Sequence, residues 1–467
     1  MATYYLAIDI GASSGRHILG SLENGKIVTE EIYRFTNGLN KIDGHLCWDI
    51  ENLKNEVING IKKCSEIGKI PATIGIDTWG VDFALLDEND ELIGNVVGYR
   101  DSRTNGMDKE VGEFYSEEEL YAVSGIQKQK YNTIYQLMAL KKQNPEQLEK
   151  AQALLLVPEY LTFILTGTKN AEYTNCTTMQ LVDPETNDWN YELIDKLGYP
   201  RRIFQKMCKP GTVAGPLKAD IAEKVGFNST VILPATHDTG SAVVAVPVEH
   251  DTALYISSGT WSLLGTEIMT ANCSELSRQA NLTNEGGYDY RFRYLKNIMG
   301  LWMLQSVKKE WDNKYSFDDI CKQAMAADIK SIVNCQDDMF LAPDSMIEAV
   351  KKACQESGQQ IPETVGEIAA VIYNSLAVCY KNACEEIESL TGTKYDTIHI
   401  VGGGSKDEYL NSLTAKFTGK TVIAGPSEAT AIGNLAVQMI ANGDFADLKA
   451  ARRCIAQSSK LTRFENK

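Results

Sequence analysis

The residues best suited to chemistry lie in three short polar stretches, each following an apolar run. They read DIGASSGR from Asp9, GIDTWGVD up to Asp82, and THDTG around Asp238. A carboxylate at the end of a strand can hold a cation or accept a proton, and neighbouring Ser, Gly and Arg residues can bind phosphate. Strands and tight turns are therefore the elements that must position these groups.

In the first stretch, apolar residues before Asp9 predict a central strand, followed by a tight turn. Gly11 and Gly15 suit a sharp turn and a close approach to a ligand. Ser13, Ser14 and the turn's N–H groups can donate to phosphate oxygens, and Arg16 adds a positive charge. Asp9 is placed to hold Mg²⁺. We interpret the stretch as a phosphate and metal hairpin.

Two other interpretations are compatible with the sequence of this first stretch. The stretch Gly11–Gly15 also matches G-x-S-x-G, the nucleophile elbow of serine hydrolases, which must lead into a helix. Here Asn24-Gly25 lies between two β-rich runs, which predicts a meander of three strands and argues against the elbow. An ordinary β-turn without a ligand remains open.

The other two stretches also have a structural alternative. Asp77 and Asp82 flank Trp79-Gly80, which suits a small polar ligand beside a ring or, equally, a β-turn with a packed Trp. The third stretch follows the apolar run VILPA and places His237-Asp238 at the start of an apolar helix. Asp in a first helical turn is also a common capping choice.

The remaining pattern predicts mixed α/β structure. We expect a helix over 48–64, mostly helices over 105–167 with a boundary near Pro158, and helices over 295–311 and 365–390. Residues 172–181 are expected to form a loop or strand. A second strand–turn–strand over 252–268 repeats the opening pattern and predicts a duplicated architecture with a cleft between the halves. Small residues in EATAIGNLAVQMI predict close packing.

A third glycine-rich site follows the strand-like run DTIHIV. Gly402-Gly403-Gly404 would let an adenine or a ribose lie against bare backbone. It is not a dinucleotide fingerprint, because position 407 is Asp407, and the later Gly419-Lys-Thr lacks the glycine that a P-loop requires.

Composition narrows the function classes. The chain has 467 residues, a formal net charge of −16 and 11 cysteines. The charge disfavours nucleic acid and anionic membrane as partners. Scattered cysteines without a C-x-x-C pair indicate reduced thiols and the cytoplasm. We expect neither a signal peptide nor a membrane span, and the sequence leaves monomer and dimer open.

Taken in order, DIGASSGR, GIDTWGVDF, HDTGSA, YISSGTWSLLG and HIVGGG resemble the FGGY carbohydrate kinases, of the actin/hexokinase/Hsp70-like ATPase superfamily. GASSGR, YRDSRTNG, EYTNCTTMQLV, NLTNEGG, LKNIMGLWMLQ and VIAGPSEA look most like the members that act on L-rhamnulose. The resemblance extends from Asp9 to about Asn434.

The resemblance implies an α/β fold of two ribonuclease-H-like (actin-like ATPase) domains, 1–246 and 247–467, with the active site between them. It implies phosphorylation of the 1-hydroxyl of L-rhamnulose, a 6-deoxy ketose, by ATP with Mg²⁺. By matching motifs, Asp238 is the expected catalytic base and Asp9 the metal-side aspartate. The expected sugar contacts are Gly80, His237, Asp238, Thr239 and Asn297. The expected nucleotide contacts are Ala12, Ser13, Ser14, Gly15, Arg16, Thr260, Gln305 and Gly403.

Phosphoryl transfer needs positioning and charge neutralisation more than covalent chemistry, and these motifs can supply both. Two alternatives stay open: a kinase for another ketose such as L-fuculose, or a non-catalytic nucleotide-dependent interaction protein of the actin/Hsp70 type. The second would need a peptide-binding domain, for which no spare segment exists.

Overall fold

The computed structural model describes residues 2–248, 253–341 and 343–466. The first residue of the predicted second hairpin, 252, lies outside this part of the chain. The described residues form two compact units. The first contains the residues up to 248 together with 267–294 and 429–458, and the second contains 253–266, 295–428 and 459–466. The expected domain boundary after 246 and the cleft between domains stay predictions.

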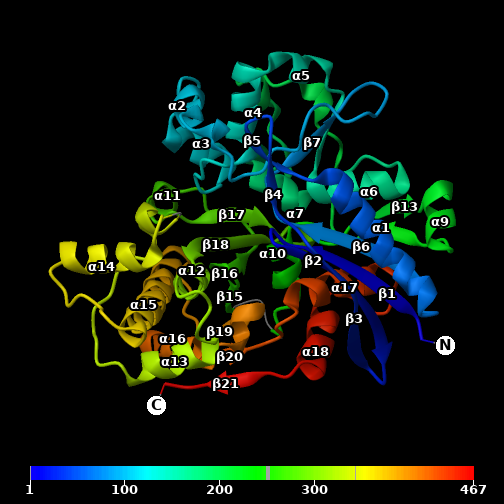
Figure 1. Ribbon diagram of the computed structural model, residues 1–467. Coiled ribbons are helices and arrows are strands. Elements are labelled where there is room, and N and C mark those ends of the chain that lie inside the picture. The colour runs from blue at the N-terminus through cyan, green and yellow to red at the C-terminus, as the bar shows by residue number, and fades with distance from the viewer. Residues whose placement is uncertain (1, 249–252, 342, 467) are drawn as a thin grey trace. The chain divides into compact units, whose positions relative to one another are not determined.

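The chain contains both strands and helices from end to end (Figure 1). The strands are β1 Tyr4–Ile10, β2 Ser14–Glu23, β3 Lys26–Thr36, β4 Leu39–Ile42, β5 His45–Trp48, β6 Pro71–Thr78, β7 Phe83–Leu86, β8 Ala153–Leu156, β9 Ala171–Glu172, β10 Val182–Asp183, β11 Asp188–Trp189, β12 Met207–Cys208, β13 Val213–Pro216, β14 Thr230–Ile232, β15 Leu254–Ser258, β16 Trp261–Ile268, β17 Thr283–Gly286, β18 Phe292–Met299, β19 Thr397–Val401, β20 Thr421–Ala424 and β21 Thr462–Phe464.

The α-helices are α1 Ile50–Glu66, α2 Met107–Gly112, α3 Glu117–Ser124, α4 Thr133–Gln143, α5 Pro145–Lys150, α6 Val157–Thr166, α7 Tyr173–Cys176, α8 Tyr191–Lys196, α9 Ala219–Val225, α10 Asp238–Val244, α11 Glu275–Gln279, α12 Trp302–Glu310, α13 Phe317–Ala326, α14 Met346–Glu356, α15 Val365–Thr391, α16 Glu408–Thr418, α17 Ala429–Ala441 and α18 Leu448–Ser458. Short 3₁₀ turns are η1 Ser102–Thr104, η2 Thr177–Met179, η3 Arg201–Ile203, η4 Tyr288–Tyr290, η5 Asp338–Phe340 and η6 Gly403–Lys406.

The six-stranded sheet of the first unit has the order β13-β14-β6-β1-β2-β3. The predicted meander is confirmed, because β1, β2 and β3 pair antiparallel in succession. Its second turn has Asn24 at φ 51° and Gly25 at φ 75°, the left-handed geometry that Asn-Gly supplies in a hairpin. On the other side of β1, β6 and then β14 run parallel to it.

Apolar side chains beneath this sheet form the main core of the first unit. The predicted helix over 48–64 is α1, and its inward face, Leu53, Val57, Ile61 and Cys64, is at most 1% exposed. Pro158 lies in the first turn of α6, as the sequence predicts, where its missing N–H costs no hydrogen bond.

Two helices from the C-terminal part of the chain, α17 and α18, pack beside the first sheet (Figure 1). The close packing predicted from the small residues of α17 is confirmed. A Cβ atom added to Gly433 would lie 1.8 Å from the Ser241 carbonyl oxygen of α10. Only glycine therefore allows α17 to approach α10 this closely.

The second sheet has the order β17-β18-β16-β15-β19-β20-β21. Its β15–β16 pair is the predicted antiparallel hairpin, and β19 and β20 run parallel to β15. The same pattern, a hairpin followed by two parallel neighbours, occurs around β1, so the predicted duplication is confirmed. In the second unit α15 packs against α13 and α16 and ends at Gly392, whose φ of 66° suits glycine at a helix end.

Three secondary-structure predictions were wrong. Residues 153–156 and 295–299 form strands rather than helix, because a short segment without regular alternation looks alike in both. Residues 173–179 form helical turns, despite their β-branched composition. Thr177 Oγ1 donates to the Thr174 carbonyl (3.0 Å) and Thr178 Oγ1 to the Asn175 carbonyl (2.7 Å), bonds that hold threonine in such a turn.

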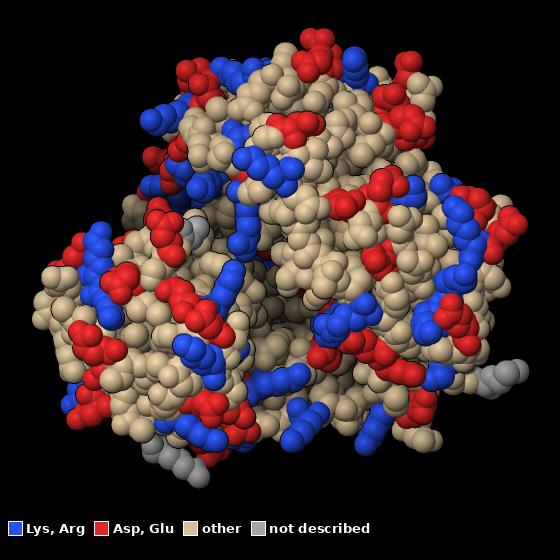
Figure 2. Space-filling model, in the orientation of Figure 1, with Lys and Arg blue, Asp and Glu red and all other residues tan. Residues whose placement is uncertain are grey.

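The surface carries both signs of charge. Figure 2 shows basic and acidic side chains interspersed over the visible face. Among the described residues, no helix has the length and apolarity needed to cross a membrane.

Candidate active site

Three aspartates lie at the carboxyl ends of parallel strands in the first unit. Asp9 in β1 is directly opposite Asp77 in β6. Beyond β14, Thr78 pairs with His237 and its N–H donates to the Thr236 carbonyl at 2.9 Å, so the chain runs beside β6 as far as Asp238. Because such strand ends meet at one edge of a sheet, the three carboxylates share that edge.

Asp9 and Asp77 differ in their partners. Arg16 donates to Asp9 Oδ2 at 2.8 Å, across the β1–β2 hairpin. Asn434 of α17 donates to Asp77 Oδ2 at 2.5 Å, while Asp77 Oδ1 has no hydrogen bond within the described structure. Burial, followed by the charge of Asp9, raises the pKa of Asp77 well above its ordinary value. Asp77 is therefore a buried carboxyl directly beside the ion pair of Asp9 and Arg16.

Asp238 is the first residue of α10, as the sequence predicts. Its Oδ1 accepts hydrogen bonds from the N–H of Thr239 (2.5 Å) and from Thr239 Oγ1 (3.1 Å). Burial and the charge of Asp9 raise the pKa of Asp238. Because 34% of the side chain is exposed, solvent moderates this rise. Asp238 is thus an accessible carboxylate at a helix start, suited to accept a proton.

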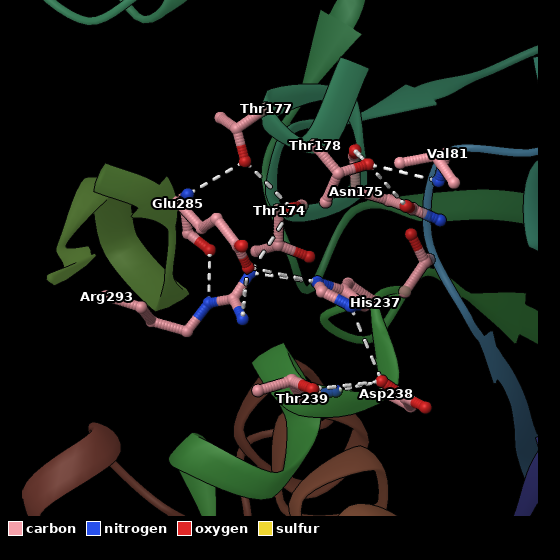
Figure 3. A network of polar contacts seen from close by, with 12 residues as sticks. Val81, Thr174, Asn175, Thr177, Thr178, His237, Asp238, Thr239, Glu285 and Arg293 are labelled. Atoms are coloured by element: carbon pink, nitrogen blue, oxygen red, sulfur yellow. Dashed lines mark hydrogen bonds and ion pairs between the residues drawn. The ribbon is translucent and has the colours of Figure 1, made fainter. Parts of the chain in front are cut away.

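His237 lies in a buried polar network (Figure 3). Its Nε2 is 3.5 Å from Asp238 Oδ1, and its Nδ1 is 3.1 Å from Nη2 of Arg293. Glu285 forms an ion pair with Arg293 at 3.1 Å. Burial and the Arg293 charge lower the pKa of His237 well below its ordinary value, so the ring is neutral at pH 7. A neutral imidazole beside Asp238 can donate a hydrogen bond to a substrate.

Gly80 follows β6 and lies against the α7 region. A Cβ atom there would be 3.0 Å from Thr178 Oγ1 and 3.3 Å from Asn175 Oδ1. The adjacent Val81 N–H donates to Thr178 Oγ1 at 3.2 Å. Trp79 does pack against a second Trp, Trp48, with ring centroids 3.9 Å apart. The packed Trp is therefore confirmed, whereas the contact of Gly80 with a ligand stays a prediction.

The turn between β1 and β2 exposes Ala12 and Ser13 and half-buries Ser14 and Arg16. Gly11 N–H donates to the Ser14 carbonyl at 2.9 Å and closes the turn. The expected reason for glycine at Gly15 was wrong: a Cβ atom there would lie 2.1 Å from the Phe35 ring, so packing against β3 requires it. Neither Gly11 nor Gly15 has a positive φ.

In the second unit, the turn of the second hairpin and the start of α12 lie together. Trp302 N–H donates to the Thr260 carbonyl at 3.1 Å, and Leu301 N–H donates to the Gly259 carbonyl at 3.1 Å. This docking places Gln305, in the second turn of α12, on the helix that begins at the Thr260 turn. Asn297 lies half-buried on β18 instead of on the helix predicted there.

The glycine run of the second unit packs on the end of β15. Cβ atoms at Gly402 and Gly404 would lie 2.9 Å from the Ser258 carbonyl oxygen and 1.9 Å from Ser258 Oγ. At Gly403 a Cβ atom would have no described neighbour within 4 Å. The outer glycines are therefore required by packing, whereas Gly403 faces open space.

The acidic edge fits a magnesium ion that also binds a nucleotide. No three His, Cys, Asp or Glu side chains of the described residues are arranged to ligate one ion. Mg²⁺ usually binds through one or two carboxylates and completes its shell with water and phosphate oxygens. Asp9 and Asp77, adjacent and repelling each other, provide such a partial ligand set.

The structure brings Asp9, Arg16 and Asp238 to one edge of the first sheet, and Thr260 and Gln305 to one corner of the second unit. The sequence pointed to Asp77 only as a neighbour of Trp79-Gly80, not of Asp9, and it gave no indication of Arg293 or Glu285. The pairing of Asp77 with Asp9 had a sequence signal, because each follows an apolar run. Arg293 and Glu285 carry no local signal, since they reach His237 from strands about 50 residues away.

Comparison with known proteins agrees with this arrangement. Residues 4–245 match the N-terminal domain of the FGGY family of carbohydrate kinases, and residues 254–442 match the C-terminal domain. A rhamnulokinase of Oceanobacillus iheyensis is 51% identical, covering 98% of this chain and 97% of its own. A rhamnulokinase of Bacillus subtilis is 39% identical, covering 99% and 95%.

Solved structures share the fold. A ligand-bound xylulose kinase from Lactobacillus acidophilus superposes with a TM-score of 0.83 at 18% identity, over 100% of this chain and 94% of that one. A glycerol kinase from Plasmodium falciparum with ADP gives a TM-score of 0.79 at 13% identity, over 100% and 94%. The predicted actin-like ATPase fold is confirmed, and the chain belongs to the FGGY family of carbohydrate kinases.

Proposed function

We propose that this protein transfers the γ-phosphoryl group of ATP to the 1-hydroxyl of L-rhamnulose, giving L-rhamnulose 1-phosphate and ADP. The observation that carries the proposal is the near full-length identity to proteins named rhamnulokinase, between 39% and 51% in the two relatives above. The geometry of the first unit supports it, because an accessible carboxylate stands at an acidic sheet edge.

Asp238 is the proposed base. As the O–P bond forms, the sugar hydroxyl becomes acidic and its proton passes to the Asp238 carboxylate. Gly80, His237, Thr239 and Asn297 are the proposed sugar contacts. Thr239 already donates to Asp238 Oδ1, which orients the carboxylate at the start of α10. A base held in this way needs little reorganisation to reach its proton.

Two groups of residues are proposed to bind the nucleotide. Ala12, Ser13, Ser14, Gly15 and Arg16 offer backbone N–H groups, hydroxyls and one guanidinium in the first unit. Thr260, Gln305 and Gly403 are the proposed contacts in the second unit. Gly403 suits this role because nothing described occupies the space its Cβ would take.

Asp9, with Asp77 beside it, is proposed to hold Mg²⁺. The ion would supply charge neutralisation for the triphosphate. Arg16 orients Asp9 through its 2.8 Å contact. The cytoplasm is the proposed compartment, on the support of cysteines that are all free where the structure describes them.

A coupled ADP-release assay tests the substrate. We expect the highest kcat/KM with L-rhamnulose and weaker activity with related ketoses, because one methyl-sized contact gives only about 1–3 kcal/mol of discrimination. L-Fuculose, D-xylulose and glycerol complete the panel. Higher kcat/KM with any of these three would overturn the substrate assignment, and no turnover with all four would overturn kinase function on this class of sugar.

A further inference from the structure

We propose that Arg293, supported by Glu285, fixes His237 as a neutral imidazole whose proton is on Nε2, and so presents a hydrogen-bond donor beside Asp238. Arg293 is a positioning residue in this account, because it acts through His237. The role in sugar binding rests on the proposed function, whereas the protonation state of the ring does not.

Arg293 is held rigidly in the first unit. Its side chain is fully buried, and its Nε donates to the Gly286 carbonyl at 2.7 Å. Its Nη1 lies 3.1 Å from Glu285 Oε2, which balances its charge. The third nitrogen, Nη2, lies 3.1 Å from His237 Nδ1 and 3.5 Å from the Thr174 carbonyl oxygen (Figure 3). With the guanidinium anchored at two other positions, this direction is fixed by the fold.

The contact decides which ring nitrogen carries the proton. A guanidinium has donors only, so the partner of Nη2 at 3.1 Å must be an acceptor, which is an unprotonated Nδ1 of His237. The competing partner of Nδ1 is Glu285 Oε2, but at 3.5 Å it is at the limit of a hydrogen bond. The shorter contact, with Arg293, therefore determines the tautomer, and the proton of the neutral ring is on Nε2.

The charges around the ring favour the same state. The charged or titratable groups that face it are Arg293, Glu285 and Asp238. Glu285 is already paired with Arg293, and 34% of the Asp238 side chain reaches solvent. A second positive charge on the buried ring would therefore meet Arg293 at 3.1 Å without full compensation.

This protonation state gives different tasks to the neighbouring residues His237 and Asp238. A ring that only donates at Nε2 cannot take the sugar proton, which leaves Asp238 as the base. Nε2 lies 3.5 Å from Asp238 Oδ1, a distance that leaves its proton available for a sugar oxygen. Without Arg293 the ring could carry its proton on either nitrogen or turn over, and the donor would be lost for part of the time.

Nitrogen NMR of the intact chain tests the ring directly. The protein has five histidines, so ¹⁵N-histidine labelling gives few signals, and His237→Gln identifies those of His237. At pH 7, without any ligand, we expect an unprotonated Nδ1 and a protonated Nε2. A proton on Nδ1, or a cationic ring, would overturn the proposal. Because no substrate is present, this result is independent of the proposed function.

Arg293→Met tests the link to sugar binding. We expect the fixed tautomer signals to be lost and KM for L-rhamnulose to rise about tenfold, as for one lost hydrogen bond, with KM for ATP unchanged. Unchanged signals and an unchanged sugar KM would contradict the proposal. If Arg293→Met does not fold, the nitrogen NMR spectrum of the unaltered protein still shows which ring nitrogen of His237 carries the proton, and so still tests the proposal.

Arg452→Met is the matched control. Arg452 is also a buried arginine, 3% exposed, that pairs with a glutamate, Glu267, at 2.8 Å and donates to the Val243 carbonyl at 2.8 Å. Its loss should lower the melting temperature but leave the His237 signals and the sugar KM unchanged. If it alters both as Arg293→Met does, the effect is one of stability and the proposal is wrong.

Discussion

Among single residues, Asp238 and His237 are the two candidates for the base, and their surroundings differ. The Asp238 side chain is 34% exposed, while that of His237 is 12% exposed and contacts an arginine. Burial and Arg293 lower the pKa of His237, which keeps the ring neutral, but its Nδ1 lone pair is already used. A free carboxylate oxygen is the better acceptor for a sugar proton.

Asp238→Asn should therefore lower kcat by roughly 10²–10⁴-fold, because the amide keeps the shape and cannot accept the proton. Calorimetry should find ATP binding nearly unchanged. His237→Gln is the control at the neighbouring position and should mainly raise the sugar KM. Near-normal turnover by the asparagine variant, together with an inactive glutamine variant, would reverse the two roles.

Two buried carboxyl groups, those of Glu159 and Glu172, both accept a hydrogen bond from the hydroxyl of Thr236. Thr236 Oγ1 lies 2.7 Å from Glu159 Oε1 and 2.9 Å from Glu172 Oε2. Burial raises the pKa of Glu159 to about 8, and the charge of Glu172 adds to this effect. In the unfolded chain Glu159 would ionise near 4.5. At a pH between these two pKa values, Glu159 is protonated in the folded protein and ionised in the unfolded chain, so unfolding releases a proton. The contribution of Glu159 to stability therefore falls as pH rises from about 4.5 to 8.

Glu159→Gln mimics the neutral acid and should remove that loss. Relative to the unaltered protein, its melting temperature should rise between pH 5 and pH 8, corresponding to a gain on the order of 1–3 kcal/mol. Glu51→Gln, at a side chain 71% exposed, is the control and should show no such trend. A constant difference between the glutamine variant and the unaltered protein would show that Glu159 is ionised when folded.

Among the elements, the hairpins and the glycine run position the expected nucleotide contacts. The outer glycines, Gly402 and Gly404, are fixed by Ser258, whereas Gly403 has open space around its missing side chain. Its φ is not positive, so a branched residue there meets no backbone strain. A substitution at Gly403 should therefore affect a ligand without affecting the fold.

Gly403→Val should raise KM for ATP far more than KM for the sugar, with the melting temperature unchanged. Gly112→Val in α2 is the control, because a Cβ atom there also meets nothing within 4 Å. Steady-state kinetics with each substrate varied in turn measures both constants. Equal changes in the two KM values, or none, would remove Gly403 from the nucleotide site.

Elements with a local signal could be predicted from the sequence. The meander follows from Asn24-Gly25, and the end of α15 follows from Gly392. The strand over 295–299 could not be told from a helix, because both of its faces are largely buried and its pattern lacks alternation. The contact between Arg293 and His237 could not be predicted from the sequence either, because it depends on how strands far apart in the sequence pair.

For the whole molecule, duplication explains why a strand–turn–strand hairpin occurs in both halves of the chain. Each sheet has a hairpin with two parallel neighbours, around β1 and around β15. Within the described strands, aspartates lie near the ends of parallel strands in the first sheet, at Asp9 and Asp77, and not in β15, β19 or β20. The sequence predicted the repeat. It did not predict that residues 429–458 belong with the first unit, because the sequence of a helix does not indicate which sheet the helix packs against.

The most direct test of the central claim is the structure of the product. The protein would be incubated with ATP, Mg²⁺ and L-rhamnulose labelled with ¹³C at position 1, and the mixture followed by ³¹P NMR. We predict a new phosphomonoester signal coupled to the labelled carbon, formed as ADP appears, and formed far more slowly by Asp238→Asn. A sugar phosphate without that coupling, or ADP without any sugar phosphate, would contradict the proposed function.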